Sequence, residues 1–433
     1  MRTRRSNVKK EKYQVLLALF LAGMLSVNLS IAWNAVELIR KGYPDFTIYY
    51  SSGRILVQGL RAQLYDEATQ YRVQQQFASG VSIRQGPLPY NHPPFEAIAF
   101  VPLSLLPYSA AYCVWNVINL IFLMTLLFFL RTALPGLRSI SAVAWLFIWV
   151  AFFPVFFALL QGQDVLLLVL LFTAAYVLLR RNSDIIAGCC LGLGLFRFHL
   201  VLPLVLILLL QKRTKAIFGF LMVAIALGFI SIAVVGWHGA LAYPGQVWQM
   251  ERAMEQHQTI FPLRMANIRG LLASLLPTAS KLESTVLIAV LSLALIFFAV
   301  RKWKTTTLAE FDLGFSLCVV VTVLVGYHTL AYDLSLLLLP ITLTLYHLFG
   351  KREPAGDTGS GKYERVNDAG GAGLYLLIPI LLLFLSPLHV FLAMRNEHYN
   401  VFAVVLLFWC WALSREIARS SRKNVQERST SQV

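Results

Sequence analysis

Long uncharged apolar runs recur along almost the whole chain. About 20 apolar residues in a helix cross the hydrocarbon core of a bilayer, which is about 30 Å thick. A composition that is 58% apolar and 13% charged agrees with such a chain and lies outside the range of soluble domains. We therefore predict an all-α polytopic membrane protein. The strongest candidate spans are residues 14–38, 108–130, 140–160, 216–236, 284–300, 313–332, 334–350, 374–394 and 398–414.

Three shorter runs complete the predicted set: 165–179, 185–196 and 200–211. Each is too short to cross the membrane comfortably alone, and the last two can bend around the group Arg197-Phe198-His199. The sequence thus predicts about twelve crossings with both termini on one side. The run from Pro93 to Pro107 is short and interrupted by prolines, so we expect re-entrant or interfacial helices there.

Basic residues set the expected orientation. By the positive-inside rule, the segments that carry most Lys and Arg face the cytoplasm. A single transmembrane domain at 14–414 then presents two long loops, about 39–107 and 237–283, to the outside of the cell membrane. The stretch 353–373, rich in Gly, Asp and Ser, is predicted to be a cytoplasmic linker. The basic segments are the tails 1–13 and 415–433 and the loops 131–138, 180–184, 212–215, 301–312 and 351–373.

Charge and cysteine patterns exclude several function classes. The formal net charge is +16, but the basic residues punctuate apolar runs and form no patch with interleaved aromatics, so no nucleic-acid partner is expected. The five cysteines lie in apolar stretches without C-x-x-C spacing, which indicates packing and argues against a disulfide framework or a zinc site. No internal repeat typical of inverted-repeat transporters is visible.

Asp45 stands at the outer mouth of the first predicted span, before an aromatic-rich loop. A carboxylate at this place suggests chemistry at the membrane surface. If Phe46 to Gln58 is a helix lying on the membrane, Tyr50 and Arg54 share one face and frame a polar ligand beside Asp45. The alternative is that Asp45 is a helix N-cap worth about 1 kcal/mol, and spacing alone does not decide between the two.

Arg197 and His199 form a second polar group, inside an apolar region. An Arg near the bilayer centre costs about 2.5–3.5 kcal/mol and is seldom placed there without a partner. A lipid phosphate is one natural partner, because the guanidinium fork matches two phosphate oxygens. The alternative is an Arg that snorkels to the interface or pairs with an acid such as Asp333.

His328 and Asp333 lie between two apolar runs, at the predicted outer boundary. Ionisable groups in such places are functional candidates, although a structural histidine with satisfied hydrogen bonds is the alternative. In the second outer loop, Arg264 and Arg269 offer further cations. A solvated loop face explains these two equally well.

Several short motifs together resemble glycosyltransferase family 87, the polyprenol-phosphate-mannose-dependent α-mannosyltransferase-like membrane proteins of the GT-C class. Each motif is weak alone, but their joint order along most of the chain is fairly specific. One departure is Arg197-Phe198, where the family commonly has Lys-Pro; the cation is kept and the proline is not. The motifs are Asp45-Phe46, Tyr49-Tyr50, Gly53-Arg54, Leu64-Tyr65-Asp66, Tyr90 with Pro93-Pro94-Phe95, Pro102-Leu103, Leu106-Pro107-Tyr108, Trp115, Asn119, Gly162-Gln163, Arg197, Arg269-Gly270-Leu271-Leu272 and His328 with Tyr332-Asp333-Leu334.

The resemblance implies a GT-C fold and an inverting transfer on the outer face of the membrane. The expected donor is a polyprenyl-phosphate sugar, with mannose inherited from characterised relatives, and the expected acceptor is a lipid or glycan hydroxyl. No cofactor or divalent metal is expected, because the chain has no D-x-D motif and no Gly-rich phosphate loop. The implied roles are Asp45 as general base, Arg197, His328 and His199 at the donor phosphate, and Tyr50, Arg54, Asp333 and Arg269 as substrate contacts.

Two other classes compete with an enzyme. A transporter or flippase of lipid-linked glycans would use the same intramembrane cations, but it would tolerate Asp45→Asn better. A structural membrane subunit without activity would require four ionisable residues to be incidental, which is expensive in lipid. These residues are Arg197, His199, His328 and Asp333.

Overall fold

The computed structural model describes residues 2–84, 86–256, 262–303, 307–349, 373–395 and 400–430. Every regular element in these ranges is helical and none is a strand, which confirms the predicted all-α fold. The α-helices are α1 (Arg2–Arg40), α2 (Phe46–Val57), α3 (Glu67–Gln75), α4 (Gly80–Arg84), α5 (Pro94–Ser104), α6 (Tyr108–Ala133), α7 (Ala142–Ala151), α8 (Phe153–Gln161), α9 (Val165–Arg180), α10 (Asp184–Leu193), α11 (Phe198–Leu210), α12 (Thr214–Gln256), α13 (Ile268–Leu275), α14 (Lys281–Lys302), α15 (Leu308–Val325), α16 (Leu338–Phe349), α17 (Leu374–Phe384), α18 (Ser386–Arg395) and α19 (Phe402–Thr430). Short 3-10 turns occupy Arg61–Gln63, Pro135–Ser139, Gly194–Arg197, Pro262–Arg264 and Asp333–Leu337.

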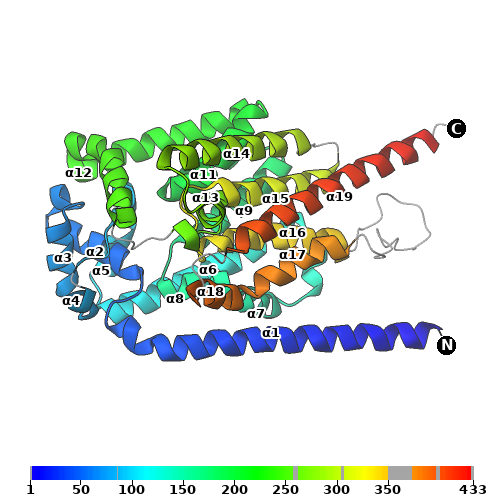
Figure 1. Cartoon of the computed structure of the whole chain (residues 1–433), viewed down its shortest axis with the longest axis horizontal. Helices are drawn as coiled ribbons and strands as arrows, with labels where there is room; N and C mark the ends of the chain where they lie inside the picture. The colour runs from blue at the N-terminus through cyan, green and yellow to red at the C-terminus, as the bar shows by residue number, and fades with distance from the viewer. Residues whose placement is uncertain are drawn as a thin grey trace.

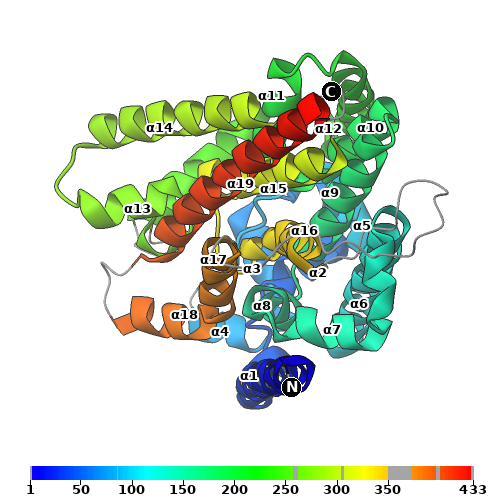
Figure 2. The same ribbon diagram turned by 90° about the vertical axis from the view of Figure 1, so that its right-hand side faces the viewer.

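The long helices run roughly along one axis, with the start of α1 and the end of α19 at the same end of the molecule (Figure 1). Viewed along this axis, α16 lies near the middle of the bundle and α1 lies at its margin, beside α7 and α8 (Figure 2). Nearly all of α15 is buried, whereas α1 exposes apolar side chains along most of its length. Such exposed apolar length is expected where lipid is the solvent.

The described helices confirm a multi-pass protein but not the predicted count of twelve. Six stretches are long and apolar enough to cross a membrane, and two bent pairs raise the number to at most eight. In the first pair α7 and α8 meet at 82°, and in the second α17 and α18 meet at 58°. Two predicted spans, 165–179 and 334–350, form the shorter apolar helices Val165–Arg180 and Asp333–Phe349, which are too short to be counted as crossings. The six stretches are Val15–Arg40, Tyr108–Ala133, Asp184–Leu210, Thr214–Gln249, Lys281–Lys302 and Leu308–Val325.

The stretch Asp184–Leu210 is counted among the six by length and composition, but it is not one straight span, because it folds back on itself as a hairpin of α10 and α11. Arg213, just after α11, places its guanidinium 3.2 Å from the carboxylate of Asp184, the first residue of α10. A straight helix of 27 residues would hold its ends about 40 Å apart. The chain turns at Arg197, whose φ of −119° and ψ of 57° are not helical. The predicted bend between two short legs is therefore confirmed, and Arg197 lies at its tip.

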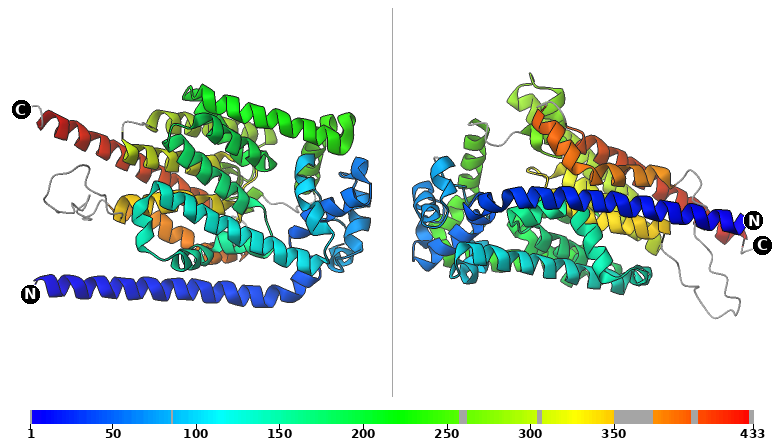
Figure 3. Two further views of the ribbon diagram at one scale, coloured as in Figure 1. Left: turned by 180° about the vertical axis from the view of Figure 1, so that it is seen from behind. Right: turned by 90° about the horizontal axis from the view of Figure 1, so that it is seen from below.

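Helices α2 to α5 form a small layer at the end of the molecule opposite the start of α1 (Figures 1 and 3). The predicted helix from Phe46 to Gln58 is confirmed as α2, and the apolar run after Pro93 forms α5. Asp66 caps α3 by accepting a hydrogen bond from the Thr69 backbone at 2.8 Å. This layer brings the first predicted outer loop against the ends of the long helices.

The second predicted outer loop is largely helical. The predicted span 216–236 ends where α12 breaks at Gly236, which has a φ of 78° and a ψ of 169°. Helix continues to Gln256, and the Tyr243 hydroxyl donates to the Asn91 carbonyl at 3.2 Å, which joins α12 to the segment before α5. The predicted linker 353–373 lies outside the described residues except at its last position.

Candidate active site

Asp45 occupies the N-cap position of α2, but its side chain makes no capping hydrogen bond. Instead its Oδ2 accepts from Gln163 Nε2 at 2.6 Å, and its backbone N–H donates to Gln161 Oε1 at 3.1 Å. Both glutamines flank Gly162, whose φ of 60° ends α8. A Cβ on Gly162 would lie 2.7 Å from the Phe46 Cβ, so this turn requires glycine. The structure does not support the alternative in which Asp45 serves as a cap.

Arg197 is held in a buried polar network and is 4% exposed. Its Nε donates to Asp164 Oδ1 at 2.6 Å, and its guanidinium donates to Asp333 Oδ1 at 2.5 Å. It also donates to Gln163 Oε1 and to the Tyr49 hydroxyl, the latter at 3.3 Å. The pairing of Arg197 with Asp333, foreseen as an alternative, is thus present. Because Gln163 contacts Asp45 as well, one side chain links the predicted base to the buried cation.

A cavity of about 340 Å³ lies beside Asp45. Its walls are mostly apolar and come from α8, α18, α19 and the segments around Met265 and Leu330. Its polar side chains are Asp45, Gln161, Arg264, Tyr332, His389 and Asn400. An apolar cavity with few polar groups is a common setting for a ligand site.

A second cavity of about 530 Å³ is lined by Arg197, His199 and His328, together with His92. The rings of His199 and His328 meet edge to face, with their centroids 6.2 Å apart. Tyr332 lines both cavities. The three residues predicted to contact the donor phosphate therefore share one cavity, and Asp45 faces the adjacent one across Tyr332.

Tyr50 and Arg54 are not brought to Asp45. They share a face of α2, as predicted, but this face packs away from both cavities: the Tyr50 hydroxyl donates to the Leu106 carbonyl at 2.7 Å, and Arg54 reaches the Ser104 carbonyl at 3.4 Å. Successive residues in a helix are about 100° apart around its axis. It is therefore the neighbouring Tyr49, to which sequence reasoning gave no role, that points to Arg197.

The remaining predicted substrate contacts lie close to the site without lining a cavity. Asp333 is fully buried, and its Oδ2 accepts from the Leu330 backbone at 2.8 Å while its Oδ1 pairs with Arg197. Arg269 is 8% exposed and lies over the Tyr327 ring, 4.2 Å from its centroid. These contacts are with other protein groups, so we interpret Asp333 and Arg269 as residues that position the site.

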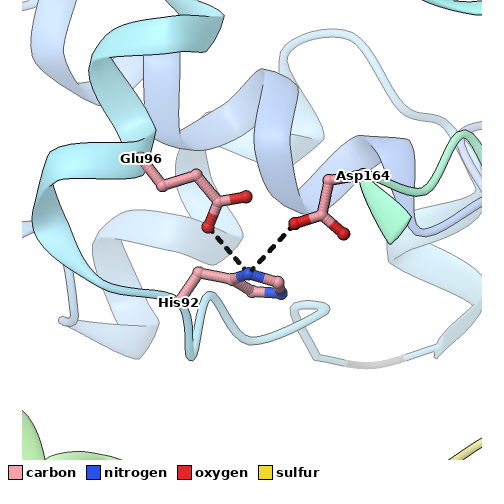
Figure 4. A group of neighbouring side chains, drawn as sticks. All are labelled: His92, Glu96 and Asp164. Carbon is pink, nitrogen blue, oxygen red and sulfur yellow. Dashed lines mark ion pairs between the residues drawn. The ribbon is translucent and has the colours of Figure 1, made fainter. Parts of the chain in front are cut away.

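His92, Glu96 and Asp164 converge beside this network, although sequence reasoning gave them no role (Figure 4). His92 precedes α5, Glu96 lies in its first turn and Asp164 precedes α9. Burial lowers the pKa of the His92 imidazole to about 4, so the ring is neutral near pH 7. An imidazole nitrogen and two carboxylates within 4.8 Å of one another can hold a metal ion. Two features of the sequence could have pointed to this group. One is the four-residue spacing of His92 and Glu96, and the other is the polar pair Gln163-Asp164 between two apolar runs.

Comparison with known proteins identifies the family of this chain. The model of glycosyltransferase family 87 matches residues 90–326, which is more than half of the chain. The matched region contains His92, Glu96, Asp164 and Arg197, whereas Asp45 precedes it. No curated protein and no solved structure matches the chain. The match over half the sequence, on an all-helical multi-pass chain, shows that the protein belongs to glycosyltransferase family 87.

Proposed function

We propose that this glycosyltransferase moves mannose from a polyprenyl-phosphate donor to a hydroxyl of a lipid or glycan acceptor on the outer face of the cell membrane. We propose inversion at the anomeric carbon, with Asp45 as the general base. The observation that carries the proposal is the position of Asp45. It faces a largely apolar cavity, is held by Gln163, and adjoins a second cavity that contains Arg197 and two histidines.

The chemistry requires a base beside the acceptor and positive or hydrogen-bonding groups beside the leaving phosphate. The acceptor oxygen attacks the anomeric carbon from the side opposite the phosphate, its proton passes to Asp45, and the bond from the anomeric carbon to the phosphate oxygen breaks. Such a base typically contributes about 10²–10⁴-fold to the rate. The polyprenyl phosphate leaves with the electron pair of that bond.

The two cavities divide these tasks. Donor phosphate in the larger cavity would meet His199 and His328, which can donate hydrogen bonds to the developing charge. Arg197 supplies a fixed positive charge behind them, although Asp164 and Asp333 already compensate it. The apolar cavity beside Asp45 suits an acceptor that is itself carried by lipid. Tyr332, at the shared wall, is where the sugar would cross from one to the other.

The deciding experiment measures transfer of radiolabelled mannose from synthetic polyprenyl-phosphate-mannose to extracted membrane lipids and glycans, with purified protein in liposomes. Asp45→Asn keeps the size of the side chain and removes the base, so we expect a loss of at least about 100-fold. Asp66→Asn is the matched control. Asp66 lies in the same helical layer and only caps α3, a role that Asn fills equally well.

Transfer by wild type and Asp66→Asn, but not by folded Asp45→Asn, would establish both the donor and the base. Transfer by Asp45→Asn at a rate close to wild type would refute Asp45 as the base. No transfer of mannose by a wild type that still binds lipid-linked sugars would refute the donor sugar, and the same assay with other hexoses would follow.

A further inference from the structure

His92, Glu96 and Asp164 form a compact group of potential metal ligands. His92 Nδ1 lies 2.7 Å from Glu96 Oε2 and 3.9 Å from Asp164 Oδ2. Figure 4 shows both carboxylates directed at the same ring nitrogen. Donors held about 2.1 Å from one ion are roughly 3.4 Å apart at the tetrahedral angle. The two distances bracket this value, so shifts of less than 1 Å in the side chains would seat an ion.

These atoms are buried but poorly satisfied. Glu96 is 6% exposed and Asp164 is 2% exposed. Apart from the contacts just described and a Glu96–Asp164 contact that requires a shared proton, both Glu96 carboxylate oxygens, Asp164 Oδ2 and His92 Nδ1 have no hydrogen-bond partner within the described part of the chain. A buried polar atom without a partner loses its hydration without compensation. Such a set of buried, facing oxygen and nitrogen atoms requires either a shared proton or a bound cation between them.

The other ring nitrogen of His92 has a polar neighbour. His92 Nε2 lies 3.5 Å from the Tyr49 hydroxyl, which donates its own proton to Gln163 Oε1 at 2.7 Å. A metal ion at Nδ1 requires the tautomer with its proton on Nε2, and in that tautomer the imidazole can donate to the Tyr49 hydroxyl. Metal-bound histidines commonly donate their second N–H to a polar neighbour in this way. In this tautomer, lone pairs on three groups face one another unless a metal ion or a proton lies between them.

We propose that His92, Glu96 and Asp164 bind one divalent transition-metal ion, of the Mn²⁺ or Zn²⁺ kind, through one imidazole nitrogen and two carboxylate oxygens. The mixed nitrogen and oxygen set favours these ions over Mg²⁺ or Ca²⁺, which prefer oxygen alone. Three protein ligands leave a coordination position open for water or a substrate oxygen. Because His92 lines the larger cavity, a bound ion would lie at its wall. Ion binding does not depend on which sugar is transferred, and it differs from the metal-free site expected from the missing D-x-D motif.

The test is metal binding by the purified full chain in detergent, stripped of metal and carrying a tag without histidines. Bound Zn²⁺ is counted by inductively coupled plasma mass spectrometry, and bound Mn²⁺ is followed by electron paramagnetic resonance. We expect one ion per chain, a rise in the thermal unfolding midpoint with either ion and not with Mg²⁺, and a pulsed-resonance coupling of Mn²⁺ to one imidazole ¹⁴N. The wild-type readouts stand even if a variant fails to fold.

Glu96→Gln keeps the shape of the side chain and removes one ligand charge, so affinity should fall by at least about tenfold. Glu416→Gln is the matched control, because Glu416 is also buried beside a histidine, with its Oε1 3.3 Å from His347 Nε2. The control should bind like wild type. Folded wild type that binds no ion, or Glu96→Gln that binds as tightly as wild type, would overturn the proposal.

Discussion

At the scale of single residues, the side chain of Gln163 connects Asp45 to Arg197. Its amide nitrogen donates to Asp45, and its amide oxygen accepts from Arg197 and from the Tyr49 hydroxyl. A side-chain amide has both a donor and an acceptor, so it can hold an anionic base on one side and a cation on the other. Gln163 is 2% exposed, and this double contact fixes where the carboxylate of Asp45 can lie.

We predict that Gln163→Leu lowers kcat by about 10- to 100-fold, because a base displaced by about 1 Å loses its alignment with the acceptor proton. KM should change little, since the amide lies behind Asp45 and not in the cavity lining. Separate measurements of kcat and KM in the mannose transfer assay check this, with Gln58→Leu as an exposed control. A rise in KM at constant kcat would instead make Gln163 a binding residue.

At the scale of elements, α10 reaches its place by packing directly on α12. A Cβ on Gly188 would lie 1.9 Å from the Ala216 carbonyl oxygen, and one on Gly219 would lie 2.0 Å from the Ile185 carbonyl oxygen. Glycines on both helices therefore bring the two backbones into contact, as small residues commonly do in membrane bundles. This contact supports the hairpin that carries Arg197 at its tip.

We predict that Gly188→Ala destabilises the protein by about 1–3 kcal/mol, because backbone atoms cannot yield to the added methyl group. The matched control is Gly228→Ala in α12, where nothing lies within 4 Å of the new Cβ. There the better helix propensity of Ala should leave stability unchanged or raise it by up to about 1 kcal/mol. Thermal unfolding of both variants in the same detergent gives the comparison. Equal shifts would show that the helices do not touch at Gly188.

The helices followed from the sequence more readily than the site did. Of their bends, however, only the one at Arg197 was predicted, whereas the predicted spans 140–160 and 374–394 are bent by 82° and 58° in the structure. The charged tip at Arg197 between two short apolar legs predicted the α10–α11 hairpin, because neither leg is long enough to cross lipid. The pairing of Arg197 with Asp164 joins residues 33 positions apart, and no local pattern encodes such a contact. The sequence predicted that Tyr50 contacts the substrate, whereas the structure turns the neighbouring Tyr49 toward Arg197. The two side chains are one step of about 100° apart around α2, and only packing against neighbouring helices decides which of them faces the site.

At the scale of the whole molecule, the polar site and the basic segments lie toward opposite ends. Helix α6 has 26 residues and is about 39 Å long. It runs from the layer of α2 to α5 toward the turn Pro135–Ser139, at the end where α1 starts (Figure 3). The described basic loops at 131–138, 180–184 and 212–215 contact one another at this second end. From the positive-inside rule we therefore propose that these loops face the cytoplasm and that Asp45 lies near the outer surface.

Single cysteines at the two ends test this arrangement. Ala62 and Arg138 are both exposed and lie at opposite ends of α6. Cys113, Cys189 and Cys190 would be replaced by Ser, while Cys318 and Cys410 are buried and can stay. In sealed right-side-out vesicles we expect a membrane-impermeant maleimide to label Ala62→Cys at once and Arg138→Cys only after the membrane is opened.

The reverse labelling pattern would place Asp45 on the cytoplasmic side, where the positive-inside rule would have failed for this chain. A donor would then have to present its sugar on the cytoplasmic leaflet. This result would refute the proposed location of the reaction, but it would not contradict Asp45 as the base. Labelling of both cysteines before opening would mean that the tested ends do not straddle the bilayer, which would contradict α6 as a full span despite its 26 apolar-rich residues. The labelling pattern thus separates where the reaction occurs from which residue performs it.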